Sequence, residues 1–444
     1  MKKETIAVTC TGMDTEGKGL VRLQGKELHV PGLIEGEKAE IELKRVKGYI
    51  SPVVVEVREK SKYRGEAACP YYYKCGGCQL QHLTSEGQAW FKQKTVEKLL
   101  GRYGKVNPII SMKEPYNYRN KVHSTLSSDS RNGVVSGIYE EYTHNVIPID
   151  KCMIQDDRAD AIVATIKDIM KKLKIRPYDE DRSQGFMRHI LIKTGFATGQ
   201  VMVVLVTSSQ IFPGRSSFMS MLLKAHPEIT TVVMNINNRK TSVVLGNQEK
   251  VLYGKGFIED VLCGCTFQIS PKSFYQINPQ QTEVLYTKAI DMAGFKGTET
   301  ILDAYCGTGT IGLIASFRVK SVYGVELNKD AVRDAIKNAK RNKITNAYFY
   351  NEDAGHFMEN LSRQNQRVDA VIMDPPRSGS DEKFLSSLVK LKPEKVVYIS
   401  CNPVTLERDL RQLTKNGYRV WEIQPVDMFP QTIHVETVVL LSRV

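Results

Sequence analysis

The chain of 444 residues has no run of consecutive apolar residues long enough for an ordinary membrane-spanning helix, which needs about 18. Its first residues, Met1 to Thr5, include lysines, but no apolar signal core follows them. It also has no internal repeat, low-complexity tract or heptad pattern, so nothing indicates an obligate protein partner. We therefore expect a cytoplasmic protein without membrane contact, in a compartment where thiols stay reduced.

A chain of this length is too long for one ordinary domain. Lysine and arginine outnumber aspartate and glutamate by 62 to 49, which gives a net charge of +13. Such an excess favours a polyanionic partner, RNA or DNA, although it can also serve solubility alone. Anionic lipid is disfavoured because no basic amphipathic helix adjoins an anchor.

Three regions differ in pattern, and together they predict a multidomain protein. Residues 1–58 contain short alternating segments of the kind that form a small closed barrel of the OB type. Residues 59–275 mix strand and helix signals, including a helix over 155–174, and predict a central α+β domain. Residues 276–444 alternate strand and helix, which predicts a Rossmann-like α/β domain with a mostly parallel sheet. The five strands predicted for the barrel are 6–9, 19–22, 26–30, 38–43 and 51–57.

Three motifs in the C-terminal region each follow an apolar run that predicts a buried strand. They are Asp303-Ala304-Tyr305-Cys306-Gly307-Thr308-Gly309, Asp374-Pro375-Pro376-Arg377 and Ser400-Cys401-Asn402-Pro403. Open α/β sheets place their chemistry at the carboxyl ends of their strands. We therefore expect one site where a thiolate meets a nucleotide-like cofactor.

The first motif continues to Gly312 and gives G-x-G-x-x-G between a strand and a helix. Glycines there allow a sharp turn and a close approach of a ligand to the backbone. Glu326 ends the next predicted strand, where a carboxylate can accept hydrogen bonds from ribose hydroxyls, and Asp353 ends the third. The glycines alone fit NAD(P) and S-adenosylmethionine equally. The acid before the loop, Asp303, favours S-adenosylmethionine, whose cationic sulfonium suits nearby carboxylates.

Cys401 is a candidate nucleophile, although a lone cysteine often serves only as a small buried side chain. The motif at Asp374 resembles the Asp/Asn-Pro-Pro-aromatic loop of amino-group methyltransferases. In that loop an aromatic ring stacks on the base, and here Arg377 replaces it, which disfavours methylation at nitrogen. Glu436 precedes another predicted strand and is either a surface acid or a base of the site.

Three cysteines lie close together in the sequence, at Cys69, Cys75 and Cys78, in the spacing C-x5-C-x2-C. Three neighbouring thiols in a reduced compartment predict a metal or cluster. Structural zinc usually takes paired C-x2-C units, and only one such unit is present, which disfavours zinc. Zinc nevertheless stays open as an alternative. A fourth ligand is needed, and Cys152 is the candidate. The other cysteines are predicted to be structural: Cys10, Cys263, Cys265 and Cys306.

Two short segments combine aromatic and basic residues of the kinds that stack on bases and track phosphates. They are Tyr118-Arg119-Asn120-Lys121 and Phe186-Met187-Arg188-His189. Each is a candidate RNA contact, with a solvated surface as the alternative.

Taken together, the motifs at 374–377, 400–403 and 434–436 resemble those of the RNA uracil-C5 methyltransferases. The segment Ser270-Pro271-x-x-Phe274-x-Gln276-x-Asn278 adds to this resemblance, which covers the whole chain. It is closest to the enzymes that act on large-subunit ribosomal RNA and carry both a TRAM domain and an iron–sulfur cluster. The barrel over residues 1–58 resembles the TRAM domain, an RNA-binding module.

The resemblance implies a role for each matching residue. Cys401 is implied to add to C6 of uracil, and Glu436 to remove the C5 proton after methyl transfer from S-adenosylmethionine. The four cysteines are implied to hold a [4Fe–4S] cluster. The cofactor end of the site is assigned Gln276, Tyr305, Gly307, Gly309, Glu326, Asp353 and Asp374.

Three functions follow as hypotheses from this set. The first is methylation of uridine C5 in 23S ribosomal RNA, at an unpaired or flipped uridine. The second is the same chemistry on the T-loop uridine of transfer RNA, which the cysteines disfavour because the usual transfer RNA enzymes of the family lack them. The third is a non-catalytic RNA-binding or redox-sensing protein.

Overall fold

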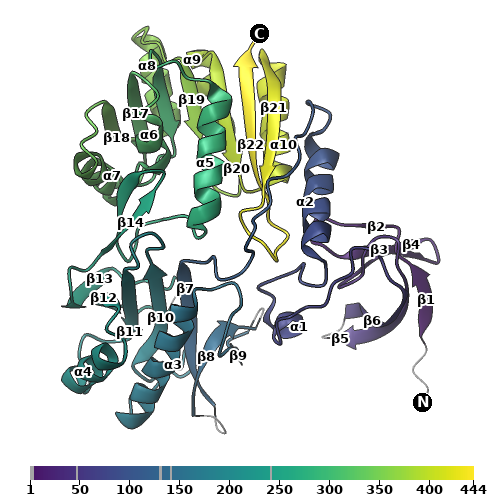
Figure 1. Cartoon of the computed structure of the whole chain (residues 1–444), viewed down its shortest axis with the longest axis vertical. Helices are drawn as coiled ribbons and strands as arrows, with labels where there is room; N and C mark the ends of the chain where they lie inside the picture. The colour runs from purple at the N-terminus through teal and green to yellow at the C-terminus, as the bar shows by residue number, and fades with distance from the viewer. Residues whose placement is uncertain (1–4, 47–48, 130–132, 141–142, 241–242) are drawn as a thin grey trace.

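The computed structural model describes residues 5–46, 49–129, 133–140, 143–240 and 243–444. Figure 1 shows three groups of elements, in purple, blue to teal, and green to yellow, that follow one another along the chain. No helix within the described ranges is both long and apolar enough to cross a membrane.

The N-terminal group consists of two three-stranded antiparallel sheets with the orders β1-β5-β6 and β2-β3-β4. Strand β1 packs next to β3, and β4 next to β6, around buried side chains that include Val8, Val21 and Ile41. All five predicted strands are present, and β2 was not predicted. The bounds are β1 Ile6–Thr9, β2 Gly12–Met13, β3 Gly19–Leu23, β4 Lys26–Val30, β5 Lys38–Val46 and β6 Tyr49–Glu59.

The central group is built on a seven-stranded sheet of order β13-β12-β11-β10-β7-β8-β9. Helix α3 (Asp157–Lys172), close to the predicted helix, packs with α4 (Arg215–Ala225) on one face. Side chains of the opposite face, such as Met202 and Val204, join the core of the C-terminal group. The sheet is thus covered on both faces. Its strands are β7 Lys121–Asp129, β8 Gly133–Tyr139, β9 Val146–Pro148, β10 Met187–Thr194, β11 Val201–Thr207, β12 Ile229–Ile236 and β13 Gln248–Tyr253.

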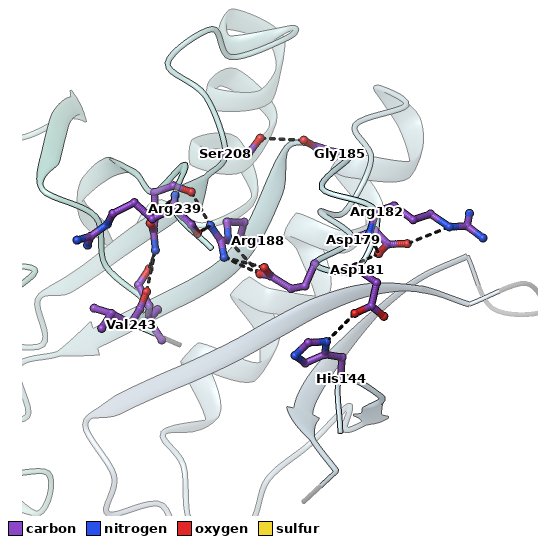
Figure 2. A network of polar contacts seen from close by, with 12 residues as sticks. His144, Asp179, Asp181, Arg182, Gly185, Arg188, Ser208, Arg239 and Val243 are labelled. Atoms are coloured by element: carbon purple, nitrogen blue, oxygen red, sulfur yellow. Dashed lines mark hydrogen bonds and ion pairs between the residues drawn. The ribbon is translucent and has the colours of Figure 1, made fainter. Parts of the chain in front are cut away.

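Burial of β10 contradicts one expectation from the sequence. The segment Phe186–His189, predicted to contact RNA, lies inside the molecule, with each residue less than a tenth exposed. Arg188 pairs with Glu180 at 2.7 Å and donates to the carbonyls of Asn237 and Arg239 at 2.7 and 2.9 Å (Figure 2). The prediction was wrong because the Arg188 guanidinium does not face solvent. It donates instead to acceptors inside the molecule.

The C-terminal group is a seven-stranded sheet of order β18-β17-β16-β19-β20-β22-β21 with helices on both faces. The first five strands are parallel, and β22 is antiparallel to both of its neighbours. This bears out a Rossmann-like α/β domain. The strands are β16 Thr300–Ala304, β17 Ser321–Glu326, β18 Ala347–Asn351, β19 Ala370–Met373, β20 Lys395–Ser400, β21 Tyr418–Val426 and β22 Glu436–Arg443.

Side chains alternate between the two faces of this sheet, as in Val371 and Ile372, and so divide its core into two halves. Helices α5 (Pro279–Ala293), α6 (Thr310–Ala315) and α7 (Lys329–Arg341) cover one face. The other face is covered by α8 (Ala354–Arg363), α9 (Glu382–Leu391) and α10 (Pro403–Lys415).

Two elements from earlier in the chain also pack on the C-terminal group. Helix α2 (Ser85–Leu100) lies against α10 and β21 (Figure 1), and its Val96 and Leu100 are part of the second core half. The hairpin of β14 (Ile258–Leu262) and β15 (Cys265–Ile269) packs on α5, α6 and α7. Both elements fall in the region 59–275 that the sequence assigned to the central domain.

Candidate active site

The sequence-predicted residues of the C-terminal region lie along one edge of the sheet. Because its first five strands are parallel, their carboxyl ends meet there, and the antiparallel β22 begins at the same edge. The proposed cofactor residues therefore belong to one side of this edge and the proposed catalytic residues to the other. In strand order they are Asp353 after β18, Glu326 on β17, Tyr305 and Gly307 after β16, Asp374 after β19, Cys401 after β20 and Glu436 on β22.

Cys401 and Glu436 lie opposite each other at the end of the β20–β22 ladder. The ladder ends with the pair Ser400–Thr437, so the next position on each strand brings the two residues together. The local sequence explains why β20 ends here: Asn402 caps α10 by accepting from the Val404 amide, and Pro403 occupies its first turn.

The Cys401 thiol is held protonated by its surroundings. Burial, followed by the charges of Glu436 and Asp374, raises its pKa to about 11. Arg377 acts in the opposite direction, through its charge and a hydrogen bond to the thiol. The nucleophilic form of Cys401 is the thiolate. Its fraction is therefore raised by one cation and lowered by burial and by two carboxylates.

Carboxyl groups gather beneath the strand ends. Burial raises the pKa of Asp303 and of Asp374 to about 7 each. Burial, followed by the charge of Asp374, also raises the pKa of Glu436, whose Oε2 is buried without a hydrogen-bond partner. A cluster of desolvated acids with an unpaired oxygen suits a cationic ligand, because a nearby positive charge stabilises their ionised forms.

The glycine loop has the close approaches that its pattern requires. A Cβ on Gly312 would lie 2.7 Å from the Asp303 carboxylate, which accepts a hydrogen bond from the Gly312 amide at 2.8 Å. The Gly307 amide donates to Glu326 at 3.2 Å, so the loop and the carboxylate at the end of β17 meet. Tyr305 adopts a positive φ of 64° and packs on Phe384. Backbone strain in a non-glycine residue is common at ligand sites.

The remaining predicted cofactor residues differ in how close they come to this cluster. Gln276 donates to the hydroxyl of Tyr286, whose pKa is raised by burial and then by the charges of Asp374, Glu436 and Asp303. Asp353 is the N-cap of α8, where its carboxylate accepts from the His356 amide. Gly309 caps α6 with a positive φ, against the ring of Phe349.

A cavity of about 180 Å³ opens at Cys401. Its walls come from α2, from the Cys401 loop, from Arg377 and from residues that precede β22. Thr15 and Glu16, in the loop between β2 and β3, also line it. The N-terminal group thus reaches the cavity that holds the candidate nucleophile.

The four predicted metal ligands lie around one cavity of about 360 Å³, lined by Cys69, Cys75, Cys78 and Cys152. Burial raises the pKa of Cys78 to about 11, with smaller contributions from the charges of the other three cysteines. The thiols are therefore neighbours although Cys152 is distant in sequence. No group of three or more His, Cys, Asp or Glu side chains within the described ranges is arranged to hold a metal ion. A closed ligand set is thus not formed, and the cysteines surround a space instead of converging on one point.

The other predicted RNA segment, Tyr118–Lys121, divides into two. Tyr118 and Asn120 are buried and donate to the carbonyls of Pro430 and Gln276. Arg119 and Lys121 line the cysteine cavity. Of the four residues of this segment, only these two line that cavity.

Sequence reasoning missed two contributors to the site. Tyr286 is buried on α5 close to the carboxylates, but within the sequence it is one apolar position of an amphipathic helix. Thr15 and Glu16 belong to a short polar turn more than 380 residues before Cys401, and no local signal connects them with it.

Comparisons with known proteins identify the family of this chain. The family model described as tRNA (Uracil-5-)-methyltransferase matches residues 92–444. The chain is 41% identical over 447 residues to a protein of Halalkalibacterium halodurans named as an uncharacterized RNA methyltransferase, covering 99% of this chain and 97% of the relative. A protein of Clostridium acetobutylicum, also named as an uncharacterized RNA methyltransferase, is 42% identical over 436 residues, covering 96% of this chain and 95% of the relative.

Among solved structures, the chain is similar to the Pyrococcus abyssi tRNA (uracil-54, C5)-methyltransferase in complex with S-adenosyl-L-homocysteine. The TM-score is 0.79 at 28% identity, and the match covers 98% of this chain and 100% of that one. The chain therefore belongs to the tRNA (uracil-5-)-methyltransferase family, whose members are S-adenosylmethionine-dependent RNA (uracil-C5) methyltransferases.

Proposed function

We propose that this enzyme methylates C5 of an unpaired or flipped uridine in 23S ribosomal RNA, through a covalent bond between Cys401 and C6 of the base. The observation that carries the proposal is the position of Cys401 opposite Glu436 at the shared strand edge. Uracil C5 is a poor nucleophile, and addition of a thiolate to C6 makes C5 part of an enolate. Bound S-adenosylmethionine supplies the electrophilic methyl group.

Arg377 stabilises the Cys401 thiolate, since its charge and hydrogen bond lower the thiol pKa. After methylation Glu436 takes the C5 proton, the electron pair of that C–H bond restores the C5–C6 double bond, and the thiolate leaves C6. A carboxylate whose pKa is raised by burial is a stronger base at neutral pH than an exposed one. The buried, unpaired Oε2 of Glu436 is the atom available for that proton.

The cofactor residues keep the roles that the resemblance implies. We place the adenosine near Glu326 and Asp353 and the sulfonium near Asp374, with Gln276, Tyr305, Gly307 and Gly309 completing the wall. This placement is supported by the order of the strands, which sets Glu326 and Asp353 away from Cys401 and Asp374 beside it. The acids around Asp374 suit the positive sulfonium.

We propose further that residues 1–58 form a TRAM domain that binds RNA, that 59–275 form a central domain, and that 276–444 form the methyltransferase domain. The two three-stranded sheets around one core support the first of these. The four cysteines suit a [4Fe–4S] cluster because all their donors are thiols around one space. Structural zinc is the alternative to the cluster.

Transfer RNA is the second candidate substrate. The family is described as a tRNA methyltransferase family, the similar Pyrococcus abyssi protein is a tRNA (uracil-54, C5)-methyltransferase, and the match to its structure covers 98% of this chain. Mass spectrometry of ribosomal and transfer RNA from cells with and without this protein separates the two. Loss of 5-methyluridine from ribosomal RNA alone supports the first substrate, and loss from transfer RNA alone supports the second.

The covalent step has its own test. Denaturing electrophoresis of the protein with 5-fluorouridine RNA and the methyl donor should show an adduct that Cys401→Ala abolishes. An adduct that persists in Cys401→Ala would move the nucleophile to another residue. Tritium release from RNA labelled with [5-³H]uridine measures turnover in the same preparations.

A further inference from the structure

The segment Asp427–Val435, here called the strap, connects β21 to β22. Its ends are fixed by the pairing of Val426 with Glu436 in the β21–β22 ladder. The strap therefore leads directly into the proposed base. Glu436 Oε2 has no hydrogen-bond partner, so the side-chain tip is not held by a polar contact at that atom.

Helix α2 holds the strap through two buried polar side chains. Lys92 is fully buried and pairs with Asp427 at 2.6 Å, and it also donates to the Phe429 carbonyl at 3.0 Å. Gln88 donates to the side chain of Gln431 and accepts from its main-chain amide, both at 2.9 Å. Burying a lysine requires its ammonium to be matched in charge and geometry, so this contact tolerates little movement.

Three further segments hold the strap by its main-chain carbonyls. The amides of Gln79 and Leu80, directly after Cys78, both donate to the Gln431 carbonyl, at 3.1 and 3.0 Å. Tyr118 donates to the Pro430 carbonyl. Asn278 and Gln281, at the start of α5, donate to the carbonyls of Met428 and Asp427.

The strap is constrained more strongly than a connection between two strands requires. Gln431 adopts a φ of 73°, a conformation that a non-glycine residue keeps only where its surroundings impose it. Gln431 itself is held by the residues after Cys78 and by α2, and the rest of the strap is held by Tyr118, which precedes β7, and by the start of α5. Each of these segments contacts the strap. The strap ends directly before Glu436, so what fixes the strap also fixes the main chain that leads into Glu436.

We infer that Gln88 and Lys92 are positioning residues, which place Glu436 for proton removal by fixing the strap. This inference rests on the proposed role of Glu436. It predicts a specific defect, because Cys401 and the methyl donor suffice for the steps before proton removal. When the base is misplaced, the methylated uridine stays bonded to Cys401, since the C5–H bond is not broken and the thiolate is not expelled.

The experiment compares Gln88→Leu and Lys92→Met with Glu436→Gln on RNA that contains ordinary uridine. Each protein is incubated with RNA and S-adenosylmethionine, and the denaturation-resistant adduct is quantified beside tritium release. Asn235→Leu is the matched control: Asn235, on β12, is also a buried amide, which donates to the Gly246 carbonyl and to Glu249 and accepts from the Gly246 amide, and none of these partners belongs to the strap. Lys92→Arg, which keeps the charge, tests rescue.

We expect Gln88→Leu and Lys92→Met to accumulate adduct as Glu436→Gln does, with turnover reduced tenfold or more. Asn235→Leu should accumulate none, and Lys92→Arg should fall between Lys92→Met and the unchanged enzyme. If Glu436→Gln accumulates adduct and both α2 variants lose turnover without any, the positioning role is refuted and the role of Glu436 stands. If Glu436→Gln itself accumulates none, the proposed base is wrong and the inference falls with it. Gln88→Leu removes no charge, so it remains informative if Lys92→Met fails to fold.

Discussion

Cys401 and Glu436 face each other one position beyond the Ser400–Thr437 pair of an antiparallel ladder, so a thiol and a carboxyl group share the end of the sheet. The charge of Glu436 raises the pKa of the thiol, whereas Arg377 lowers it. Together with burial and the charge of Asp374, these two neighbours set how much thiolate is present before RNA binds.

Removal of the carboxylate should therefore make Cys401 more reactive toward a small alkylating agent. Burial, followed by the charge of Glu436, raises the pKa of the thiol to about 11, so replacement Glu436→Gln removes the second of these causes and moves the pH profile of alkylation to lower pH. Replacement Arg377→Met removes the opposing cation and moves the profile to higher pH. A shift of one pH unit corresponds to about tenfold in thiolate fraction at neutral pH. The measurement is the rate of iodoacetamide labelling at Cys401 against pH.

The buried cysteines Cys10 and Cys306 provide an internal reference, since neither contacts Arg377 or Glu436 in the described contacts. Equal shifts in the same direction for both variants would contradict control of the thiol by these two neighbours.

Binding of S-adenosylmethionine should strengthen with pH more steeply than binding of S-adenosylhomocysteine. The pKa of Asp374 is raised to about 7 by burial, so below that pH the carboxyl is protonated in the free enzyme. A cationic sulfonium favours the ionised carboxylate and must displace its proton at low pH, and the neutral thioether has no such requirement. The ratio of the two affinities should rise up to about tenfold between pH 6 and pH 8.

Isothermal titration calorimetry of both ligands at these pH values checks the expectation, with Asp374→Asn as the control that should flatten the ratio. A ratio that stays constant in the unchanged protein would move the sulfonium away from Asp374.

Much of the C-terminal fold was accessible from sequence because buried parallel strands are continuous apolar runs with motifs at their carboxyl ends. The runs before Asp374 and Cys401 became β19 and β20 as expected. The insertion of β22 between β20 and β21 was not accessible, because the order of strands in a sheet is not written in any local pattern. The proximity of Cys401 and Glu436 depends on that insertion.

The segment Phe186–His189, which was predicted to contact RNA, shows where a local sequence pattern was misleading. Its mixture of aromatic and basic residues is typical of an RNA contact, but β10 is covered on both faces, and Arg188 finds its acceptors inside. The residues that hold the strap were inaccessible for a related reason. Gln88 and Lys92 look like polar positions of an amphipathic helix, and only the packing of α2 against β21 makes them internal.

The four-cysteine site predicts a difference between two cysteine substitutions. Cys78→Ser should lower bound iron and sulfide in anaerobically purified protein, because it removes one of the four thiols around the cavity. It should also increase hydrogen exchange in the strap, since the residues after Cys78 donate to Gln431. Cys263→Ser is the control, because Cys263 lies in the turn between β14 and β15 and lines no part of that cavity. Zinc without sulfide in the unchanged protein would assign a structural zinc instead of a cluster.

The contact of the N-terminal group with the cavity at Cys401 predicts that substitution of one glycine impairs RNA binding more than substitution of another glycine of the same conformation. Gly17 and Gly25 have nearly equal positive φ values, 76° and 78°, so alanine at either position carries the same backbone strain, about 1–2 kcal/mol. A Cβ at Gly17 would lie 3.0 Å from both Ile433, on the strap, and Leu80, whereas a Cβ at Gly25 meets nothing within 4 Å. Gly17→Ala should therefore displace the loop that carries Thr15 and Glu16 away from Cys401, and Gly25→Ala should not.

The expected result is a several-fold rise in the KM for RNA in Gly17→Ala, with the affinity for S-adenosylhomocysteine unchanged in both variants. The proposed cofactor residues lie before α5 and at or after the ends of β16–β19, and none of them lines the cavity that the loop reaches, which is why the two ligands should respond differently. Steady-state methylation kinetics with RNA as the varied substrate, together with calorimetry for the cofactor product, measure both quantities. Equal RNA kinetics for Gly17→Ala and Gly25→Ala would show that the loop lines the cavity without contributing to substrate binding.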